Sequence, residues 1–222
     1  MRPADEVIVS FGDGSVRAVP YDMPIIGYGT RNINTLRLWE AKSLVDLDLG
    51  KFNQQDYLHA TQDKTRAEDI SRVLYPNDST DEGKKLRLKQ QYFFVSASLQ
   101  DILRKYKRIH GTNFDEFPSY VAIQLNDTHP VIAIPELMRL FVDLEGLSWE
   151  KAWSIVEKTF SYTNHTILAE ALEKWWVGLY EQVVPRVYQI TQGINNQLRG
   201  FLAERFPNDP ARQDRMSIIQ GN

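Results

Sequence analysis

Two segments of the same kind most constrain how this chain can fold, because each is a short apolar run that ends in a turn carrying a histidine. The first run, Val121 to Leu125, leads into Asn126-Asp127-Thr128-His129-Pro130, and an apolar helical pattern follows from Ile134 to Leu144. The second run, Thr159 to Tyr162, leads into Thr163-Asn164-His165-Thr166. Such runs between helical patterns are typical of parallel strands in an α/β fold. Both turns are therefore expected at the carboxyl ends of neighbouring strands, where open α/β sheets bind ligands.

The remaining pattern predicts an N-terminal β-hairpin and several long helices. Strands are expected at 7–11, 16–19 and 34–39, with a tight turn at 12–15 and an ordinary turn at 24–30. Helical spacing predicts a polar helix over 53–74, an amphipathic helix over 88–106 and a helix that Ser148 caps. It also predicts a helical run over 168–180, and a last helix that Pro185 opens and Pro207 stops. We interpret the whole as an α/β chain of one domain.

Composition excludes several classes of function. A formal net charge of -3 gives no electrostatic case for binding nucleic acid or an anionic membrane. The absence of cysteine excludes disulfides, thiolate metal sites and cysteine nucleophiles, and it fits a cytoplasmic protein. No apolar run approaches the roughly 20 residues that span a bilayer, and the first residues do not resemble a signal peptide.

The chemistry of the two histidine turns stays open on spacing alone. Asp127-x-His129 and Asn164-His165 superficially suit a dinuclear metallophosphatase, but the other histidines, His59 and His110, lie in a polar helix and at a basic helix end. We therefore expect no metal site. A serine nucleophile is not expected either, because no Gly-x-Ser-x-Gly elbow occurs. The two turn histidines either bind a ligand or are satisfied polar groups of the core.

Three polar segments also allow two interpretations each. The acidic loop over 75–83 is either a surface connection or a gate beside a crevice. The cations Arg104, Lys105, Lys107 and Arg108 either complement a helix dipole or form an anion site. The polar helix over 53–70, with its thin apolar stripe, has either a solvated face or a face toward a partner.

Several strings, in order along the chain, resemble the α-glucan phosphorylases, the family of glycogen, starch and maltodextrin phosphorylase. They include Tyr21-Asp22-Met23-Pro24, Asn34 to Trp39, Ile70 to Asp78, Leu86 to Gln90, Val121 to Pro130, Ile134 to Arg139 and Tyr162 to Thr166. The resemblance implies phosphorolysis of α-1,4-glucan to glucose 1-phosphate with pyridoxal phosphate as cofactor. It also implies the N-terminal Rossmann-like domain of a glycosyltransferase-B-type fold.

The resemblance also implies roles for individual residues. His165 matches the histidine that faces the transferred sugar and is our candidate catalytic residue, while Asp127, His129, Asn164 and Asp78 are candidate substrate-binding residues. Asp78 falls in the loop that closes over the family's catalytic cleft. The helix expected over Asn53 to Ile70 corresponds to one that packs across the family's dimer interface, so we expect a homodimer.

Other features depart from the family. Lys105 replaces the second arginine of the animal enzymes' nucleotide-effector site, whose first basic position Arg104 keeps, and Ser79 stands where animal enzymes commonly carry asparagine. The lysine that holds pyridoxal phosphate has no counterpart here, so we interpret residues 1–222 as one partial domain, an internal piece of the N-terminal half. The isolated chain is expected to be inactive. A non-catalytic glucan-binding or assembly module remains the alternative.

Overall fold

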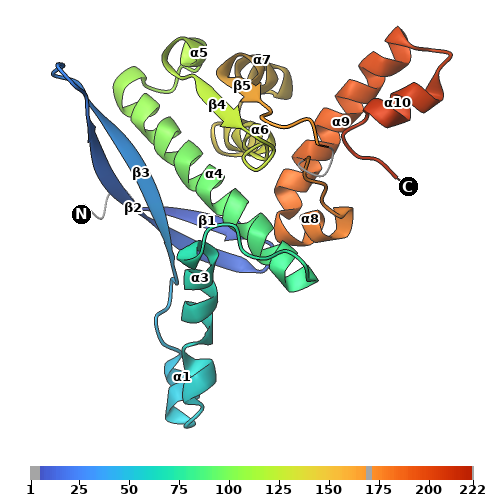
Figure 1. Cartoon of the computed structure of the whole chain (residues 1–222). Coiled ribbons are helices and arrows are strands. Elements are labelled where there is room, and N and C mark those ends of the chain that lie inside the picture. Colours follow the sequence, from blue (N-terminus) through green and yellow to red (C-terminus); the bar gives the residue numbers. More distant parts are fainter. Residues whose placement is uncertain (1–5, 169–171, 222) are drawn as a thin grey trace. The chain divides into compact units, whose positions relative to one another are not determined.

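The computed structural model describes residues 6–168 and 172–221. The described chain forms two compact units, one ending at Ile109 and the other beginning at His110, and each is considered by itself (Figure 1). Both helices and strands occur, which confirms the mixed α/β class. The expectation of one partial domain over residues 1–222 stays a prediction.

The first unit contains an antiparallel sheet of three strands. They are β1 (Val7–Phe11), β2 (Gly14–Ile26) and β3 (Ile33–Lys42), in the order β1-β2-β3. Gly14 has a φ of 147°, which lets the chain reverse tightly after Phe11. Beyond Pro20, most side chains of the β2–β3 ribbon are exposed on both faces. The expected strands are confirmed, but β2 continues well past Val19.

Helix α4 (Asp81–His110) packs on this sheet and is the longest helix of the described residues. Tyr92 contacts Phe11 edge-to-face with ring centroids 5.7 Å apart, and the indole of Trp39 donates to the Ser98 hydroxyl over 3.1 Å. Trp39 is buried, as expected for a core residue. Gly111, with a φ of 72°, follows the last helical residue, as glycine commonly does after a helix.

The polar helix predicted over 53–74 is wrong, because three short helices occupy this part of the chain. They are α1 (Leu49–Asn53), α2 (Tyr57–Ala60) and α3 (Gln62–Arg72). Asp56 accepts a hydrogen bond from the backbone N–H of His59 and starts α2, while Gln55 has a φ of 65° that no helix accommodates. The helical spacing over 53–74 therefore did not reveal that Asp56 caps a new helix inside this segment. Figure 1 shows α3 leading from the sheet toward α1.

The second unit is built around a parallel pair of strands, β4 (Ile123–Asn126) and β5 (Phe160–Thr163). Between them the chain forms α6 (Ala133–Arg139), a π-helical turn (Leu140–Leu144) and α7 (Trp149–Thr159), which begins where Ser148 accepts from the N–H of Lys151. The predicted strands, their parallel pairing and the Ser148 cap are confirmed. Helix α6 begins three residues after Pro130 and contains the start of the apolar helical pattern expected from Ile134.

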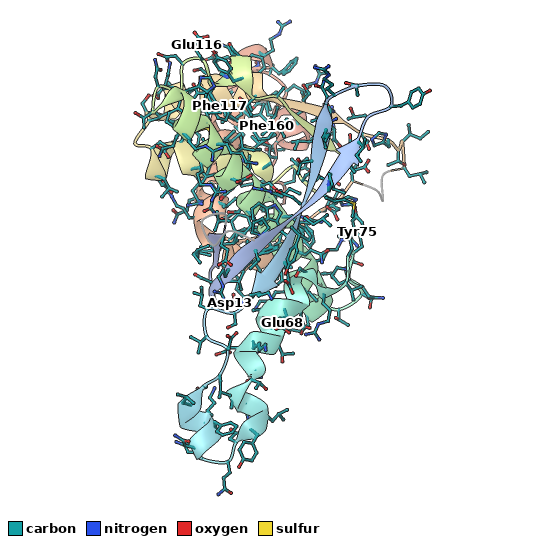
Figure 2. The ribbon with its side chains drawn as sticks, turned by 90° about the vertical axis from the view of Figure 1, so that its left-hand side faces the viewer. Asp13, Glu68, Tyr75, Glu116, Phe117 and Phe160 are labelled. Carbon is teal, nitrogen blue, oxygen red and sulfur yellow. The ribbon has the colours of Figure 1, made fainter. Side chains whose placement is uncertain are left out.

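Helix α9 (Pro185–Arg205) packs against α6 and α8 (Val177–Val183), and α10 (Pro210–Met216) follows it. Three aromatic rings pack together in this core. The ring centroid of Phe141 lies 5.1 Å from that of Phe114 and 5.4 Å from that of Phe117. Phe117 is the first residue of α5 (Phe117–Tyr120) and is labelled in Figure 2. These contacts join α5 to the π-helical turn that follows α6.

The helical run predicted over 168–180 is wrong for its first half. The described residues between Asn164 and Trp176 are extended or irregular, and the helix begins only at Val177. Residues 169–171 of that prediction lie outside the described residues. Glu173 in this stretch contacts the turn after β4, so tertiary contacts override a helical spacing.

Within the described ranges, no helix is both long and apolar enough to cross a lipid bilayer.

Candidate functional site

The two predicted turns lie next to each other because β4 and β5 end at the same level. Asn126, the last residue of β4, is the register partner of Thr163, the last residue of β5. Asp127 and Asn164 are therefore the first residues beyond the carboxyl ends of two parallel strands. This is the edge at which open α/β sheets bind ligands. The sequence prediction that one sheet presents both turns is confirmed.

Asp127 joins the two turns directly. Its backbone N–H donates to the Thr163 carbonyl over 2.9 Å, and its carboxylate Oδ1 accepts from the backbone N–H of His165 over 3.3 Å. Its φ of 61° is a left-handed conformation, which Asp tolerates better than most residues other than glycine. The turn thus aims the Asp127 carboxylate across the sheet edge at the main chain of His165.

His129 contacts a residue that sequence reasoning did not single out. Its Nδ1 lies 3.0 Å from Oε1 of Glu173, and the hydroxyl of the neighbouring Thr128 accepts from the backbone N–H of Glu173 over 3.3 Å. The side chains of His129 and Glu173 are 28% and 14% exposed. Glu173 lies in the stretch whose spacing predicted a helix, so no pattern pointed to this contact.

His165 and Asn164 are exposed, and the chain around them is shaped by local hydrogen bonds. The side-chain carbonyl of Asn164 accepts from the N–H of Thr166 over 3.3 Å, an Asx turn that bends the chain away from β5. Within β5, Thr163 accepts from the Gln124 side-chain amide over 2.8 Å. His165 therefore lies in a turn whose main-chain N–H groups, at His165 and Thr166, both donate to side chains.

Asp78, the remaining candidate, belongs to the first unit and is described there by itself. It lies in the loop between α3 and α4, where its carboxylate is 3.3 Å from the Arg87 guanidinium. Arg87 also stacks on the ring of Tyr75, which is labelled in Figure 2. A Cβ on Gly83 would lie 2.1 Å from the Asn77 carbonyl oxygen. Glycine is thus required where the loop folds back on the first turn of α4.

Two ion pairs, one buried and one partly exposed, lie on the helices of the second unit. Glu136 is fully buried on α6 and accepts two hydrogen bonds from Arg139, at 2.7 and 2.8 Å. Asp143 accepts two from Arg186 on α9, and these bonds lower the pKa of the Asp143 carboxyl. Burial raises the pKa of the Tyr180 phenol to about 12, so this hydroxyl keeps its proton at neutral pH. These groups brace α6, which follows the turn at Asp127.

The described residues contain no group of three or more His, Asp or Glu side chains arranged to hold a metal ion. The polar groups at the ends of β4 and β5 instead contact backbone amides and each other. Such a set suits the hydroxyls of a polar substrate, because carboxylates accept and amides donate hydrogen bonds.

A sequence model described as carbohydrate phosphorylase matches residues 4–222. This chain belongs to the carbohydrate phosphorylase family. It is 54% identical over 212 residues to the liver form of glycogen phosphorylase from Homo sapiens. It is 53% identical to the muscle form from Oryctolagus cuniculus and 51% identical to the brain form from Mus musculus, each over 212 residues. The resemblance inferred from the motifs is confirmed.

Each of these alignments covers 92% of this chain and 25% of the relative. The chain therefore spans about a quarter of the length of these glycogen phosphorylases. Within that quarter, the structure brings Asp127, His129, Asn164 and His165 together at one sheet edge. Thr128 and Glu173 join them, and only the three-dimensional contacts reveal those two residues.

The basic end of α4 in this phosphorylase chain is paired internally. Asp101, whose side chain is 5% exposed, lies within ion-pair distance of Arg37, Arg104 and Lys105. Burial alone would raise the pKa of Asp101, but the hydrogen bonds from Lys105 and Arg104 outweigh burial and lower it. Two of the four cations noted in the sequence thus have a carboxylate partner on their own helix.

Proposed function

We propose that this chain is part of an enzyme that cleaves α-1,4-glucan with inorganic phosphate and releases glucose 1-phosphate, and that it acts in the cytoplasm. The observation that carries the proposal is the Asp127–His165 hydrogen bond at the shared end of β4 and β5, in a chain of the carbohydrate phosphorylase family. In this reaction the glycosidic C–O bond breaks, phosphate oxygen bonds to the anomeric carbon, and the departing glucan oxygen takes a proton.

His165 is the proposed catalytic residue. The main-chain carbonyl of a residue placed beside the sugar stabilises positive charge as the anomeric carbon gains oxocarbenium character, and the ring can hydrogen-bond a sugar hydroxyl. Asp127 accepts from the N–H of His165, and Asn164 accepts from the N–H of Thr166, which shares a peptide group with the His165 carbonyl; both bonds orient the main chain of His165 before the reaction. This chain's proposed contribution is a wall of the cleft, within a glycosyltransferase-B-type domain.

The other candidates are proposed to bind sugar. Asn164 and His129 offer an amide and an imidazole at the same sheet edge, and both side chains reach solvent. The Asp127 carboxylate can accept from a hydroxyl with its second oxygen. Asp78 is proposed to act from the loop that closes over the substrate, where Arg87 and the close approach at Gly83 hold it.

Pyridoxal phosphate is proposed as the cofactor of the full-length enzyme, where it supplies a phosphate that acts as acid and base. A lysine that forms a Schiff base needs a sheltered amine with a lowered pKa. Among the described residues no lysine is buried, so none fits that attachment. The attachment is therefore assigned to a part of the enzyme outside this chain, and none of the roles above depends on it.

A homodimer is proposed through the segment Leu49 to Arg72, in place of the single helix expected over Asn53 to Ile70. Helices α1 and α2 expose the apolar side chains of Leu49, Phe52, Tyr57 and Leu58. The rings of Phe52 and Tyr57 contact each other with centroids 5.0 Å apart, which makes a small preformed patch. Exposed apolar patches commonly mark interfaces between proteins.

The full-length enzyme tests the proposal. With maltoheptaose and phosphate it should form glucose 1-phosphate, whereas the isolated chain should form none because it lacks the cofactor site. His165→Ala in the full-length enzyme should lower kcat by about 10²-fold and change the oligosaccharide affinity of the free enzyme little, as expected for a group that acts in the transition state. Turnover by the isolated chain, or equal losses in kcat and affinity, would contradict these roles.

A further inference from the structure

The turn after β4 is attached to the chain that follows β5 at two points. The first is the hydrogen bond from the His165 N–H to Asp127. The second is at Glu173, whose N–H donates to the Thr128 hydroxyl and whose carboxylate lies 3.0 Å from Nδ1 of His129. The three consecutive residues from Asp127 to His129 therefore contact both His165 and Glu173, which are eight positions apart in sequence.

The first attachment is weak by itself. At 3.3 Å it lies beyond the usual range of N–H···O bonds, and the residue that donates it is exposed, so water competes for both groups. A chain segment held at one point can adopt more conformations than one held at two points. Because Glu173 is held as well as His165, less conformational entropy is lost when His165 meets Asp127.

The second attachment is better sheltered. The Glu173 side chain is 14% exposed; its main-chain N–H donates to Thr128, and its carboxylate lies within ion-pair distance of the neighbouring His129. Glu181 on α8 is exposed and serves as a reference glutamate outside this contact.

We propose that Glu173 is a positioning residue for His165, acting through Thr128 and His129 to hold the main chain of His165 against Asp127. The expected effect of Glu173 on kcat rests on the proposed function. It also gives His129 a structural duty besides any contact with sugar. Glu173 itself touches no reacting atom in this scheme.

Hydrogen exchange and kinetics in the full-length enzyme test this role. Glu173→Ala should raise the exchange rate of the His165 amide about tenfold or more, while amides of α7 keep their rates. It should lower kcat for phosphorolysis of maltoheptaose about tenfold and leave KM within about twofold. Glu173→Gln should recover most of kcat, because a side chain of the same length can still place its amide oxygen beside His129.

Two further variants keep the test decisive. Glu181→Ala is the matched control and should change neither the exchange of His165 nor kcat. Thr128→Val removes the hydroxyl that accepts from the Glu173 N–H, so it should also raise the exchange rate of the His165 amide. This variant serves in place of Glu173→Ala if Glu173→Ala fails to fold. Unchanged His165 exchange in the folded variants would overturn the proposal, as would a uniform rise over the whole unit.

The two proposals fail in different ways. If the wild-type full-length enzyme forms no glucose 1-phosphate, the proposed function fails, and the exchange rates still decide whether Glu173 positions His165. If the wild type is active but Glu173→Ala keeps full kcat and normal exchange, only the positioning role is lost.

Discussion

At the scale of single residues, charge placement decides which groups serve stability and which serve the site. Asp101 is nearly buried and lies beside three cations, of which Arg37 also pairs with Asp22 through two bonds of 2.7 Å. By contrast, Asp127 accepts from a backbone amide rather than from a cation in the contacts described above. A carboxylate that is paired with several cations is held in one orientation by them. A carboxylate that accepts one hydrogen bond from an amide can still accept another from a sugar hydroxyl.

Replacing Asp101 by Asn should lower the free energy of unfolding by about 2 kcal/mol at neutral pH, because three clustered cations lose their shared negative charge. The pKa of Asp101 lies below its ordinary value in the folded protein, so this stabilisation is present at neutral pH. It is lost as the pH falls from about 4 through the lower pKa of the folded state.

Urea unfolding at neutral and acidic pH measures this effect. The wild type and Asp101→Asn should differ at neutral pH and converge in acid. Asp46→Asn is the control, because Asp46 is an exposed aspartate of the same unit. A stability difference that persists unchanged in acid would show that the charge of Asp101 is not its cause.

At the scale of elements, sequence patterns predicted the helices and strands that depend on local sequence and missed the features that depend on tertiary contacts. The strands β1, β3, β4 and β5 and the helices α4, α7 and α9 follow from apolar periodicity and capping residues. The helix expected over 53–74 is divided because Asp56 caps a new helix after the left-handed Gln55. The run before Val177 is not helical, because Glu173 bonds to a turn 45 residues earlier in sequence.

The candidate site shows the same division. The resemblance and the strand ends placed Asp127, Asn164 and His165 at one edge, which the parallel register explains. Thr128 and Glu173 were not predicted, since a contact between distant segments has no periodic signature. Asp78 could not be related to the others by pattern, because it lies in a separate unit.

The loop between α3 and α4 is held by one buried side chain of α4. The Gln90 amide donates to the carbonyls of Ile70 and Val73 over 2.9 and 2.8 Å and accepts from the N–H of Tyr75 over 3.0 Å. Tyr75 has a left-handed φ of 53°, a conformation that needs such support. Gln90 therefore fixes the start of the loop that carries Asp78.

Gln90→Leu should lower the free energy of unfolding by about 2–3 kcal/mol, because it removes three hydrogen bonds and leaves partly buried backbone groups without them. Urea unfolding with constant m measures the loss. The same change at Gln192, an exposed position of α9, is the control and should cost less than about 0.5 kcal/mol. Equal effects at both positions would show that the amide contacts contribute nothing specific.

At the scale of the whole molecule, much apolar surface of the first unit faces solvent. It lies on the β2–β3 ribbon and on α1 and α2, including Met23, Ile26, Leu36, Leu49 and Leu58. The described chain is a quarter of the length of its glycogen phosphorylase relatives, and large exposed apolar areas are typical of interfaces. The patch on α1 and α2 is the one assigned to a second copy above.

Leu58→Asp tests the proposed dimer. Leu58 is 78% exposed on α2, and burying a charge in an apolar interface should weaken dimerisation of the full-length enzyme at least about tenfold, or about 1.4 kcal/mol. Sedimentation velocity over a range of concentrations measures the dissociation constant. Ile109→Asp, a matched change at an exposed apolar residue near the end of α4, should leave it unchanged. A dimer unaffected by Leu58→Asp would exclude this patch as the contact.

Strands β4 and β5 end at paired residues, and this limits where insertions and deletions can occur in members of this family. Asp127 meets His165 because Asn126 and Thr163 occupy the same rung of the ladder, and a one-residue insertion or deletion inside either strand would separate them. The connection through α6 and α7 carries no such constraint, because it only has to return the chain to the same rung. Natural relatives should therefore tolerate gaps in that crossover and conserve the spacing from strand to turn.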